Sequence, residues 1–428
     1  MEGHDYCMSM LDELSDRAVW EEFYQYKKEK GHLSDKEERE LALFIESESY
    51  LPLATHLAAG RYCFGPPNKI LINKMSTGKK RIVYSFAPDE TMILKLLAYL
   101  LYRYEDFFAD NLYSFRRNTG ARQAIRRLRS HRLITEMYCY KVDISNYFNS
   151  INVDRLMVML TGIMAGDERL VAFFRALLTD QRVRSEDMII YEEKGVMAGV
   201  PVAPFFANVY LHGMDRYFGS KQVLYARYSD DFICFAPTKA EIEGYRADIA
   251  DWLERYELSI NHDKEFLYEP GTPWEFLGIC CRDGSIDLSA GTINKMKGRI
   301  RRKARSLWRW AEKKQVGTEK AIIAFIRAMN RKLFIGADGN DLTWARWFFP
   351  LLTTDRGLKE LDAYLQQYIR YLTTGRHSKA NYRLDYDAIK ALGYRSMVHE
   401  YYQHKTDAGK ANAGKTNADK TENEGGMT

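Results

Sequence analysis

Two adjacent carboxylates, Asp230 and Asp231, lie between two strand-forming apolar runs, residues 223–228 and 232–236. The intervening turn is very short, so the runs predict a β-hairpin with carboxylates at one end. An aspartate in a hairpin turn is most often only a turn former, and the pair alone is a weak signal. A catalytic site would need a further carboxylate at the end of another strand.

Asp143 supplies such a carboxylate, because it lies at the end of another apolar run, residues 137–144. Strands that bring carboxylates to one sheet edge can hold two Mg²⁺ ions, which take hard oxygen ligands and leave positions for substrate phosphates. Two such ions can activate an attacking hydroxyl and stabilise the leaving oxygen in phosphoryl transfer. The aspartates therefore predict a site for two Mg²⁺ ions, with Mn²⁺ as an alternative metal.

The same residues resemble motifs of the reverse transcriptase family. Asp143 and its neighbours resemble motif A, and Tyr228-Ser229-Asp230-Asp231 resembles the Tyr-x-Asp-Asp of motif C. Further blocks resemble, in the family's order, the basic fingers hairpin (79–81), the block at 113–116, motif B (199–211), motif D (258–264) and the primer grip (276–278). The resemblance covers about residues 61–290 and is nearest in style to bacterial retron and group II intron enzymes.

The resemblance implies a role for each matching residue. Asp143 and Asp230 would be the principal catalytic metal ligands, Asp231 would support them, and the main-chain carbonyl of Ile144 is a further candidate metal ligand. Phe148 matches the steric gate that excludes a 2′-hydroxyl, so deoxynucleotides are the expected substrates. The other nucleotide-binding candidates are Lys74, Lys80, Arg81, Arg116 and Gly199.

Motif D implies a role for one further residue, and motif B differs from the family's pattern at two places. Lys264 matches the motif D lysine and would donate a proton to the departing pyrophosphate. In motif B, Met197-Ala198-Gly199 replaces the usual Pro-Gln-Gly, and Ala203 replaces the usual serine. The missing glutamine normally braces template and nucleotide, so unusual fidelity or template preference is expected. The aspartates are intact, which predicts an active polymerase.

The order of helical and strand-like runs predicts an α+β protein. With the resemblance, this becomes a right-hand polymerase fold, with an antiparallel sheet in fingers and palm and an α-helical thumb. Within it we expect a helix capped at Ser34, a hairpin over 69–84, a helix over 89–108 and a strand over 276–281. The predicted regions are an N-terminal helical extension (1–60), fingers and palm (61–290), a basic thumb (291–402) and a disordered low-complexity tail (403–428).

Charge is distributed unevenly within a net charge of +5. Residues 1–60 hold 14 acidic and 6 basic residues, whereas residues 291–334 hold 14 basic and 2 acidic ones. Tryptophans are interleaved with the arginines there, which suits a phosphate backbone and exposed bases. The predicted nucleic-acid contacts share one helical face and are Lys295, Arg299, Arg302 and Arg305.

Other classes of protein fit less well. The six cysteines are scattered without a C-x-x-C pair, which disfavours a zinc ribbon or a secreted disulfide scaffold. No secretory signal is visible, and the uncharged stretch 195–214 contains two prolines, so it is interpreted as a buried loop and helix. We expect a cytoplasmic protein without a membrane partner.

The leading hypothesis is an RNA-directed DNA polymerase that copies a structured noncoding RNA into cDNA from dNTPs. The acidic extension, the long thumb and the lack of endonuclease or ribonuclease H segments resemble the defence-associated "unknown group" of reverse transcriptases, which implies antiphage defence. Two alternatives stay open: a retron or group II intron-type retroelement enzyme, and a non-catalytic, maturase-like RNA-binding module. The sequence does not indicate the oligomeric state or the primer.

Overall fold

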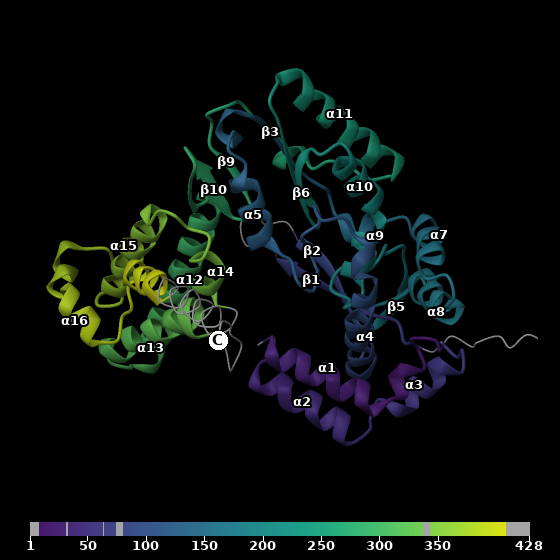
Figure 1. Cartoon of the computed structure of the whole chain (residues 1–428). Coiled ribbons are helices and arrows are strands. Elements are labelled where there is room, and N and C mark those ends of the chain that lie inside the picture. Colours follow the sequence, from purple (N-terminus) through teal and green to yellow (C-terminus); the bar gives the residue numbers. More distant parts are fainter. Residues whose placement is uncertain (1–7, 31–32, 63, 74–79, 337–342, 408–428) are drawn as a thin grey trace, which may run out of the picture. The chain divides into compact units, whose positions relative to one another are not determined.

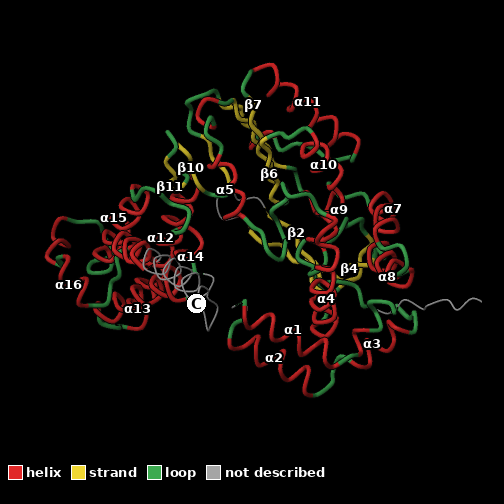
Figure 2. Tube along the Cα trace, in the orientation of Figure 1, coloured by secondary structure: helices red, strands yellow, loops and turns green. Residues whose placement is uncertain are grey.

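The chain folds into two units that divide between Leu277 and Gly278. The computed structural model describes residues 8–30, 33–62, 64–73, 80–336 and 343–407. Figure 1 shows both units, and Figure 2 shows that the first mixes helices with strands whereas the second is mostly helical. Within the described ranges, no helix is both long and apolar enough to cross a membrane.

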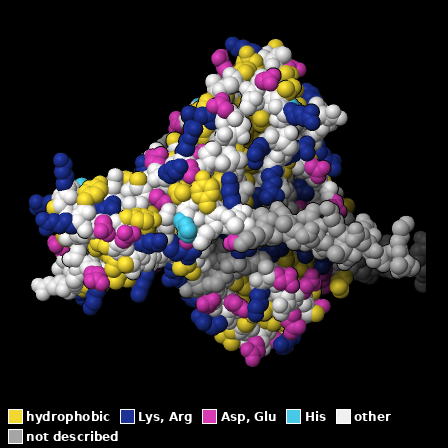
Figure 3. Space-filling view, turned by 60° about the vertical axis from the view of Figure 1, so that its left-hand side comes forward, with side chains coloured by type: hydrophobic (Ala, Val, Ile, Leu, Met, Phe, Trp, Pro, Cys, Tyr) yellow, Lys and Arg dark blue, Asp and Glu magenta, His cyan; other side chains and the backbone are white. Residues whose placement is uncertain are grey.

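Helices make up the N-terminal segment, as predicted. They are η1 (Glu13–Ser15), α1 (Arg17–Glu29), α2 (Asp35–Glu46) and α3 (Leu51–Ala58). The cap at Ser34 is confirmed: its Oγ accepts the Glu37 N–H at 3.3 Å, and the Glu37 carboxylate accepts the Ser34 N–H at 3.0 Å. Acidic side chains gather on these helices, at the bottom of Figure 3.

A four-stranded sheet follows, in the order β2-β1-β4-β5. Its strands are β1 (Asn68–Asn73), β2 (Lys80–Ser85), β4 (Arg182–Ser185) and β5 (Met188–Tyr191). The antiparallel β1–β2 pair confirms the predicted hairpin, whose turn lies outside the described residues. The β4–β5 hairpin was not predicted, because strands of four residues are too short to show a clear alternation.

The second sheet has the order β6-β7-β3-β8, and all its pairs are antiparallel, as predicted. Its strands are β3 (Tyr138–Asp143), β6 (Leu224–Tyr228), β7 (Asp231–Ala236) and β8 (Phe266–Tyr268). Helix α11 (Lys239–Arg255) packs against β3 and β7, and α5 (Ala121–Ser130) packs against β6. Residues 232–236 are all buried, which explains their unbroken apolar run. The predicted α+β class is confirmed.

Helices connect the strands of the first unit. One predicted helix, over 89–108, is divided: α4 ends at Leu100, and the chain continues as the 3-10 helix η2, in which Tyr104 has non-helical backbone angles. The remaining elements are α4 (Pro88–Leu100), η2 (Leu101–Phe107), η3 (Ile134–Glu136), α6 (Tyr147–Ser150), α7 (Val153–Ile163), α8 (Glu168–Thr179), α9 (Ala203–Tyr210), α10 (His212–Ser220), η4 (His262–Lys264) and β9 (Trp274–Phe276).

The prediction of one strand over 276–281 was wrong. Leu277 and Gly278 have φ angles of 50° and 84°, which end β9 and start a separate strand, β10 (Ile279–Arg282). A Cβ at Gly278 would lie 2.8 Å from Thr292 Oγ1, so a side chain has neither the space nor the backbone angle it needs. An apolar run alone does not reveal such a break.

The second unit is helical after a short hairpin of β10 with β11 (Ser285–Leu288). Ser289 caps the long helix α12, because its Oγ accepts the Thr292 N–H at 3.1 Å. The predicted helical character is confirmed, with α12 (Ala290–Lys314), α13 (Thr318–Asn330), the π-helix η5 (Arg331–Ile335), α14 (Trp344–Phe348), α15 (Arg356–Tyr371), η6 (Lys379–Arg383) and α16 (Tyr386–Ala391).

The predicted boundaries of the four regions stay predictions. The boundary at 290/291 falls at the start of α12, whereas the two units divide at 277/278. Residues 403–407 of the predicted tail are helical, and its remainder lies outside the described residues.

Candidate active site

The structure brings the predicted aspartates together at one edge of the second sheet. Asp143, the last residue of β3, lies opposite Asp231, the first residue of β7. The Ile144 N–H donates to the Asp230 carbonyl at 3.0 Å, which joins the end of β3 to the β6–β7 turn. Asp143, Ile144, Asp230 and Asp231 therefore form one cluster, as their predicted roles require.

The turn that carries Asp230 is a two-residue connection between β6 and β7. Its first residue, Ser229, has φ 62°, a left-handed conformation that a non-glycine residue adopts at a cost. The Ser229 N–H donates to Ser114 Oγ at 2.8 Å, and the Ser229 carbonyl accepts from Arg227 at 3.3 Å. Contacts on both sides of Ser229 thus hold the turn in this shape.

A fully buried ion pair lies beneath the turn. The Arg227 Nε donates to Asp215 Oδ1 at 2.8 Å, and its Nη2 donates to Asp215 Oδ2 at 2.5 Å. Both side chains are completely buried. Tyr225 also donates its hydroxyl to Asp215, at 3.1 Å, and Arg227 donates to the Asn208 carbonyl at 3.2 Å. The pair thus joins β6 to α9 and α10.

Residues of motif D hold Asp143 from the other side. The Asn261 amide donates to Asp143 Oδ1 at 3.1 Å, and the Asn261 N–H donates to the Asp143 carbonyl at 2.8 Å. Lys264 Nζ donates to Asp143 Oδ2 at 2.7 Å, while its side chain stays 53% exposed. Lys264 is therefore within the predicted site, attached to a carboxylate but open to solvent.

Burial and crowding of the carboxylates shape the electrostatics of the cluster. Burial raises the pKa of Asp230, and the charge of Asp143 raises it further. Burial also raises the pKa of Asp231 to about 7, although Lys141, with Nζ 3.7 Å from Oδ1, acts against that rise. A divalent cation beside Asp143 and Asp230 would stabilise the ionised carboxylates and so offset the effect of burial on their pKa.

The donors at this edge fit Mg²⁺. Asp143 and Asp230 supply hard carboxylate oxygens, and the buried Oδ1 of Asp231 has no hydrogen-bond partner. Among the described residues, no three His, Cys, Asp or Glu side chains form a self-contained metal site. A metal bound here would thus need further ligands from substrate phosphates and water, as Mg²⁺ commonly does.

Comparison with known protein families agrees with this geometry. Residues 72–281 match the family described as reverse transcriptase (RNA-dependent DNA polymerase). This segment is thus similar to a reverse transcriptase domain. It contains the aspartate cluster, and its antiparallel central sheet confirms the predicted right-hand polymerase fold class.

One curated relative and two solved structures are similar to the chain. The uncharacterized 91 kDa protein in the cob intron of Schizosaccharomyces pombe (strain 972) is 27% identical over 162 residues, which cover 38% of this chain and 20% of that protein. The chain thus spans about a fifth of the length of that relative. Apo telomerase from Candida tropicalis, truncated from its C-terminal domain, shares 14% sequence identity with a TM-score of 0.44, and the match covers 53% of this chain and 55% of that one. Telomerase from Candida albicans, in complex with a TWJ fragment of telomeric RNA, shares 13% sequence identity with a TM-score of 0.42. That match covers 85% of this chain and 71% of the telomerase chain.

The predicted steric gate, Phe148, follows Asp143 closely in the chain and lies among aromatic rings. Phe148, on α6, packs edge-to-face on Phe115, with ring centroids 6.3 Å apart. Phe115 also lies 6.5 Å from the ring of Tyr228, which precedes the turn. Phe148 is half-buried, and its role as the gate stays a prediction.

The motif B loop is held between the first sheet and α6. The Tyr84 N–H of β2 donates to the Ala198 carbonyl at 2.8 Å. Gly199 has φ 101°, and a Cβ there would lie 3.0 Å from the Tyr84 carbonyl oxygen, so this close approach requires glycine. The structure thus gives Gly199 a packing role against β2, and its contact with a nucleotide stays a prediction.

The predicted triphosphate-binding cations have different surroundings. Lys80 and Arg81 are exposed on β2, and Arg81 is near enough to Asp230 to lower the pKa of that carboxyl, against the larger effect of burial. Lys74 lies outside the described residues. Arg116 instead donates to Glu105 Oε1 at 2.5 Å and to the Ala109 carbonyl at 3.0 Å. These contacts give Arg116 a structural role, and the geometry does not favour a nucleotide contact.

The predicted basic stripe lies on α12 in the second unit. Lys295, Arg302 and Arg305 are exposed, on the side of the helix opposite the buried Met296, Ile300 and Ala304. The fourth member, Arg299, is half-buried, and its Nε is buried without a hydrogen-bond partner. Three of the four residues are thus exposed on one side of α12, and the contact of the stripe with nucleic acid stays a prediction.

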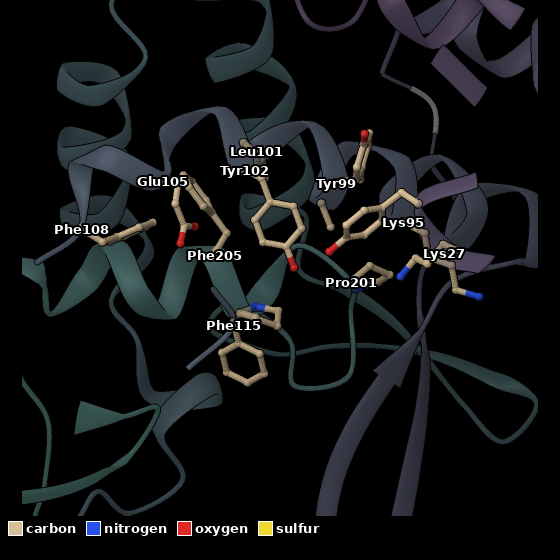
Figure 4. A pocket seen from close by; sticks show the side chains of 13 residues that line it. Lys27, Lys95, Tyr99, Leu101, Tyr102, Glu105, Phe108, Phe115, Pro201 and Phe205 are labelled. Atoms are coloured by element: carbon tan, nitrogen blue, oxygen red, sulfur yellow. The ribbon is translucent and has the colours of Figure 1, made fainter. Parts of the chain in front are cut away.

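A cavity of about 350 Å³ lies beside Phe115. Figure 4 shows the rings of Tyr102, Phe115 and Phe205 facing it, with Lys27 and Lys95 together at one end. Burial lowers the pKa of Lys27, and the nearby charge of Lys95 lowers it further. This end of the cavity would therefore favour an anion, while the rings offer apolar faces.

Sequence reasoning missed the residues that position the turn. Arg227 and Asp215 were not singled out, although an arginine inside an apolar strand is a usable signal for a buried ion pair. Ser114 and Asn208 belong to recognised blocks, but their hydrogen bonds, Ser114 Oγ to Asn208 Oδ1 at 3.1 Å and Asn208 Nδ2 to the Ser114 carbonyl at 2.9 Å, depend on tertiary packing. No local pattern reveals such a pairing.

The buried ion pair predicts a large stability cost for its removal. Replacing Asp215 by asparagine leaves the Arg227 guanidinium buried without its counter-ion, so the free energy of unfolding should fall by about 3 to 5 kcal/mol. Urea unfolding followed by tryptophan fluorescence measures the change. The matched control is Glu243→Gln, since Glu243 pairs with Lys239 at 3.9 Å on an exposed face and should contribute at most about 0.5 kcal/mol. Equal losses in both variants would contradict this account.

Proposed function

We propose that the chain is an RNA-directed DNA polymerase that extends a DNA strand on an RNA template. The observation that carries the proposal is the meeting of Asp143 and Asp230 at one sheet edge, inside a segment similar to a reverse transcriptase domain. The exposed cations of β2 supply the charge that a triphosphate needs. Phe148, which packs on Phe115, would supply a bulky ring to select the sugar.

Each group has a defined part in the reaction. Asp143 and Asp230 would hold two Mg²⁺ ions, which when bound activate the primer hydroxyl and stabilise the leaving pyrophosphate. Asp231 supports the cluster from the first position of β7. Lys80 and Arg81 would orient the phosphates of the incoming deoxynucleotide. Lys264, which bonds Asp143 at 2.7 Å, would keep a proton at Nζ for the departing group.

The cavity beside Phe115 would receive the unpaired template ahead of the active site. Its rings can contact bases, and Lys27 and Lys95 can contact phosphates. Phe115 borders both the cavity and Phe148, so a template that enters through the cavity would arrive next to the incoming nucleotide. The N-terminal helix α1, which carries Lys27, thus contributes to the template path.

Primer extension on a defined RNA template tests the proposed activity. Asp230→Asn removes a ligand charge without changing shape, so extension should fall at least about a hundredfold. Asp251→Asn, an exposed aspartate on α11, is the matched control and should keep full activity. RNA binding by Asp230→Asn should be unchanged, because the basic surfaces are elsewhere. RNA binding without extension by the unaltered protein would favour the maturase-like binding module.

We also propose a biological setting: a cytoplasmic enzyme that copies a partner noncoding RNA in antiphage defence. Its support is the resemblance to the defence-associated group of reverse transcriptases. The second candidate is a retroelement enzyme of the retron or group II intron type. One observation favours it: the curated relative lies in an intron.

Sequencing the RNA that copurifies with the protein separates these two settings. A discrete noncoding RNA encoded apart from any intron is the expected result, and its cDNA should be absent from cells that carry Asp230→Asn. Those cells should also lose protection against phage. Recovery of the intron that surrounds the gene would instead select the mobility function.

A further inference from the structure

A second cavity, of about 430 Å³, lies in the helical unit between the C-terminal half of α15 and η6. It is lined by Tyr364, Gln367, Tyr368, Arg370, His377, Ser378, Lys379, Asn381 and Tyr382. This lining combines aromatic rings with cations and includes no Asp or Glu. Such a surface suits a ligand that is both flat and anionic.

The aromatic side chains form a wall along one side. The rings of Tyr364 and Tyr368 lie 4.9 Å apart, and His377 packs edge-to-face on Tyr368 at 5.1 Å. Tyr382 is 61% exposed, and the Arg370 guanidinium lies over its ring at 4.8 Å from the centroid. One face of Tyr382 is thus supported by a cation, while the ring remains open to a stacking partner.

The loop that carries these groups is held in place. Asn381, only 4% exposed, donates to the Arg376 carbonyl at 2.6 Å and accepts from Thr374 Oγ1 at 3.0 Å. Gly375 has φ 70°, and a Cβ there would overlap the Trp308 indole of α12. Arg370 Nε donates to the Leu384 carbonyl at 2.9 Å. The cavity is therefore built into the fold and costs little ordering on binding.

Cations of α12 continue the positive surface from the cavity. Helix α12 packs against α15, and Lys297, which pairs with Glu360 at 2.6 Å, lies 5.2 Å from the ring centroid of Tyr364. Burial and Tyr364 raise the pKa of Tyr368, whereas the charges of Arg305 and Arg301 act against that rise. Arg305 also belongs to the basic stripe of α12. A strand bound along that stripe would pass beside the cavity.

We propose that this cavity binds one unpaired nucleotide of single-stranded nucleic acid. The base would stack on Tyr382, and the flanking phosphates would contact Lys379, Arg370 and the cations of α12. A paired base cannot enter, because its faces are covered by its neighbours in the duplex. This binding needs neither metal nor dNTP, so it goes beyond the proposed polymerase activity and can be tested apart from it.

Fluorescence anisotropy with the full-length chain tests the proposal. The probes are oligouridylate RNA and oligothymidylate DNA of about 8 nucleotides, in buffer without metal or dNTPs. Tyr382→Ala should weaken binding of at least one probe about fivefold or more, whereas Tyr382→Phe, which keeps the ring, should bind like the unaltered protein. The probe that binds more tightly shows whether the nucleotide belongs to RNA or to DNA.

Two controls make the result specific. Tyr386→Ala removes another exposed tyrosine ring, on α16 and outside the cavity, and should not change binding. A blunt hairpin duplex should bind Tyr382→Ala as tightly as it binds the unaltered protein. Lys379→Gln, at an exposed cation of the cavity, should also weaken single-strand binding. The proposal is overturned if Tyr382→Ala and Lys379→Gln both bind the single strands normally, or if the duplex loses as much affinity.

Discussion

The buried ion pair between Arg227 and Asp215 is the constraint on which the active site depends. Two ionised groups without solvent exposure are stable only when geometry and hydrogen bonds satisfy both of them. Here two short contacts join the side chains, and Tyr225 supplies a further donor. Since breaking such a pair leaves a buried charge, β6 cannot move relative to α10 without a large cost.

A series of hydrogen bonds connects the buried ion pair to the turn that carries Asp230. Arg227 reaches the Ser229 carbonyl, Ser114 accepts the Ser229 N–H, and Asn208 bonds Ser114 in turn. The left-handed turn at Ser229 is thereby fixed, and it sets where Asp230 follows. On the opposite side, motif D fixes Asp143 through a side-chain and a main-chain hydrogen bond. The site consists of two aspartates that are positioned independently and brought into register by the β3–β7 pair.

Local patterns predicted most elements but not the contacts between them. Strands β3, β6 and β7 of the central sheet, the capped helix at Ser34 and the helical second unit follow from apolar periodicity and capping residues, whereas the three-residue strand β8 was not predicted. The break at Gly278 could not be predicted, because it depends on the approach of Thr292. For the site, the aspartates stand out by type and position, whereas Arg116 matches a motif and yet is occupied by Glu105. The roles of Arg227 and Asp215 become visible only when the fold brings them together.

The rate of templated nucleotide incorporation by Ser114→Ala tests the central claim most directly. This change removes the acceptor for the Ser229 N–H but leaves the buried ion pair intact, so Asp230 should be misplaced while the fold survives. We predict that kcat for one complementary deoxynucleotide on an RNA template falls about ten- to a hundredfold, with little change in KM. Ser220→Ala, whose Oγ bonds a helix carbonyl on the exposed surface, should retain the original kcat. An unchanged kcat in Ser114→Ala, or no templated incorporation by the unaltered protein, would contradict the account.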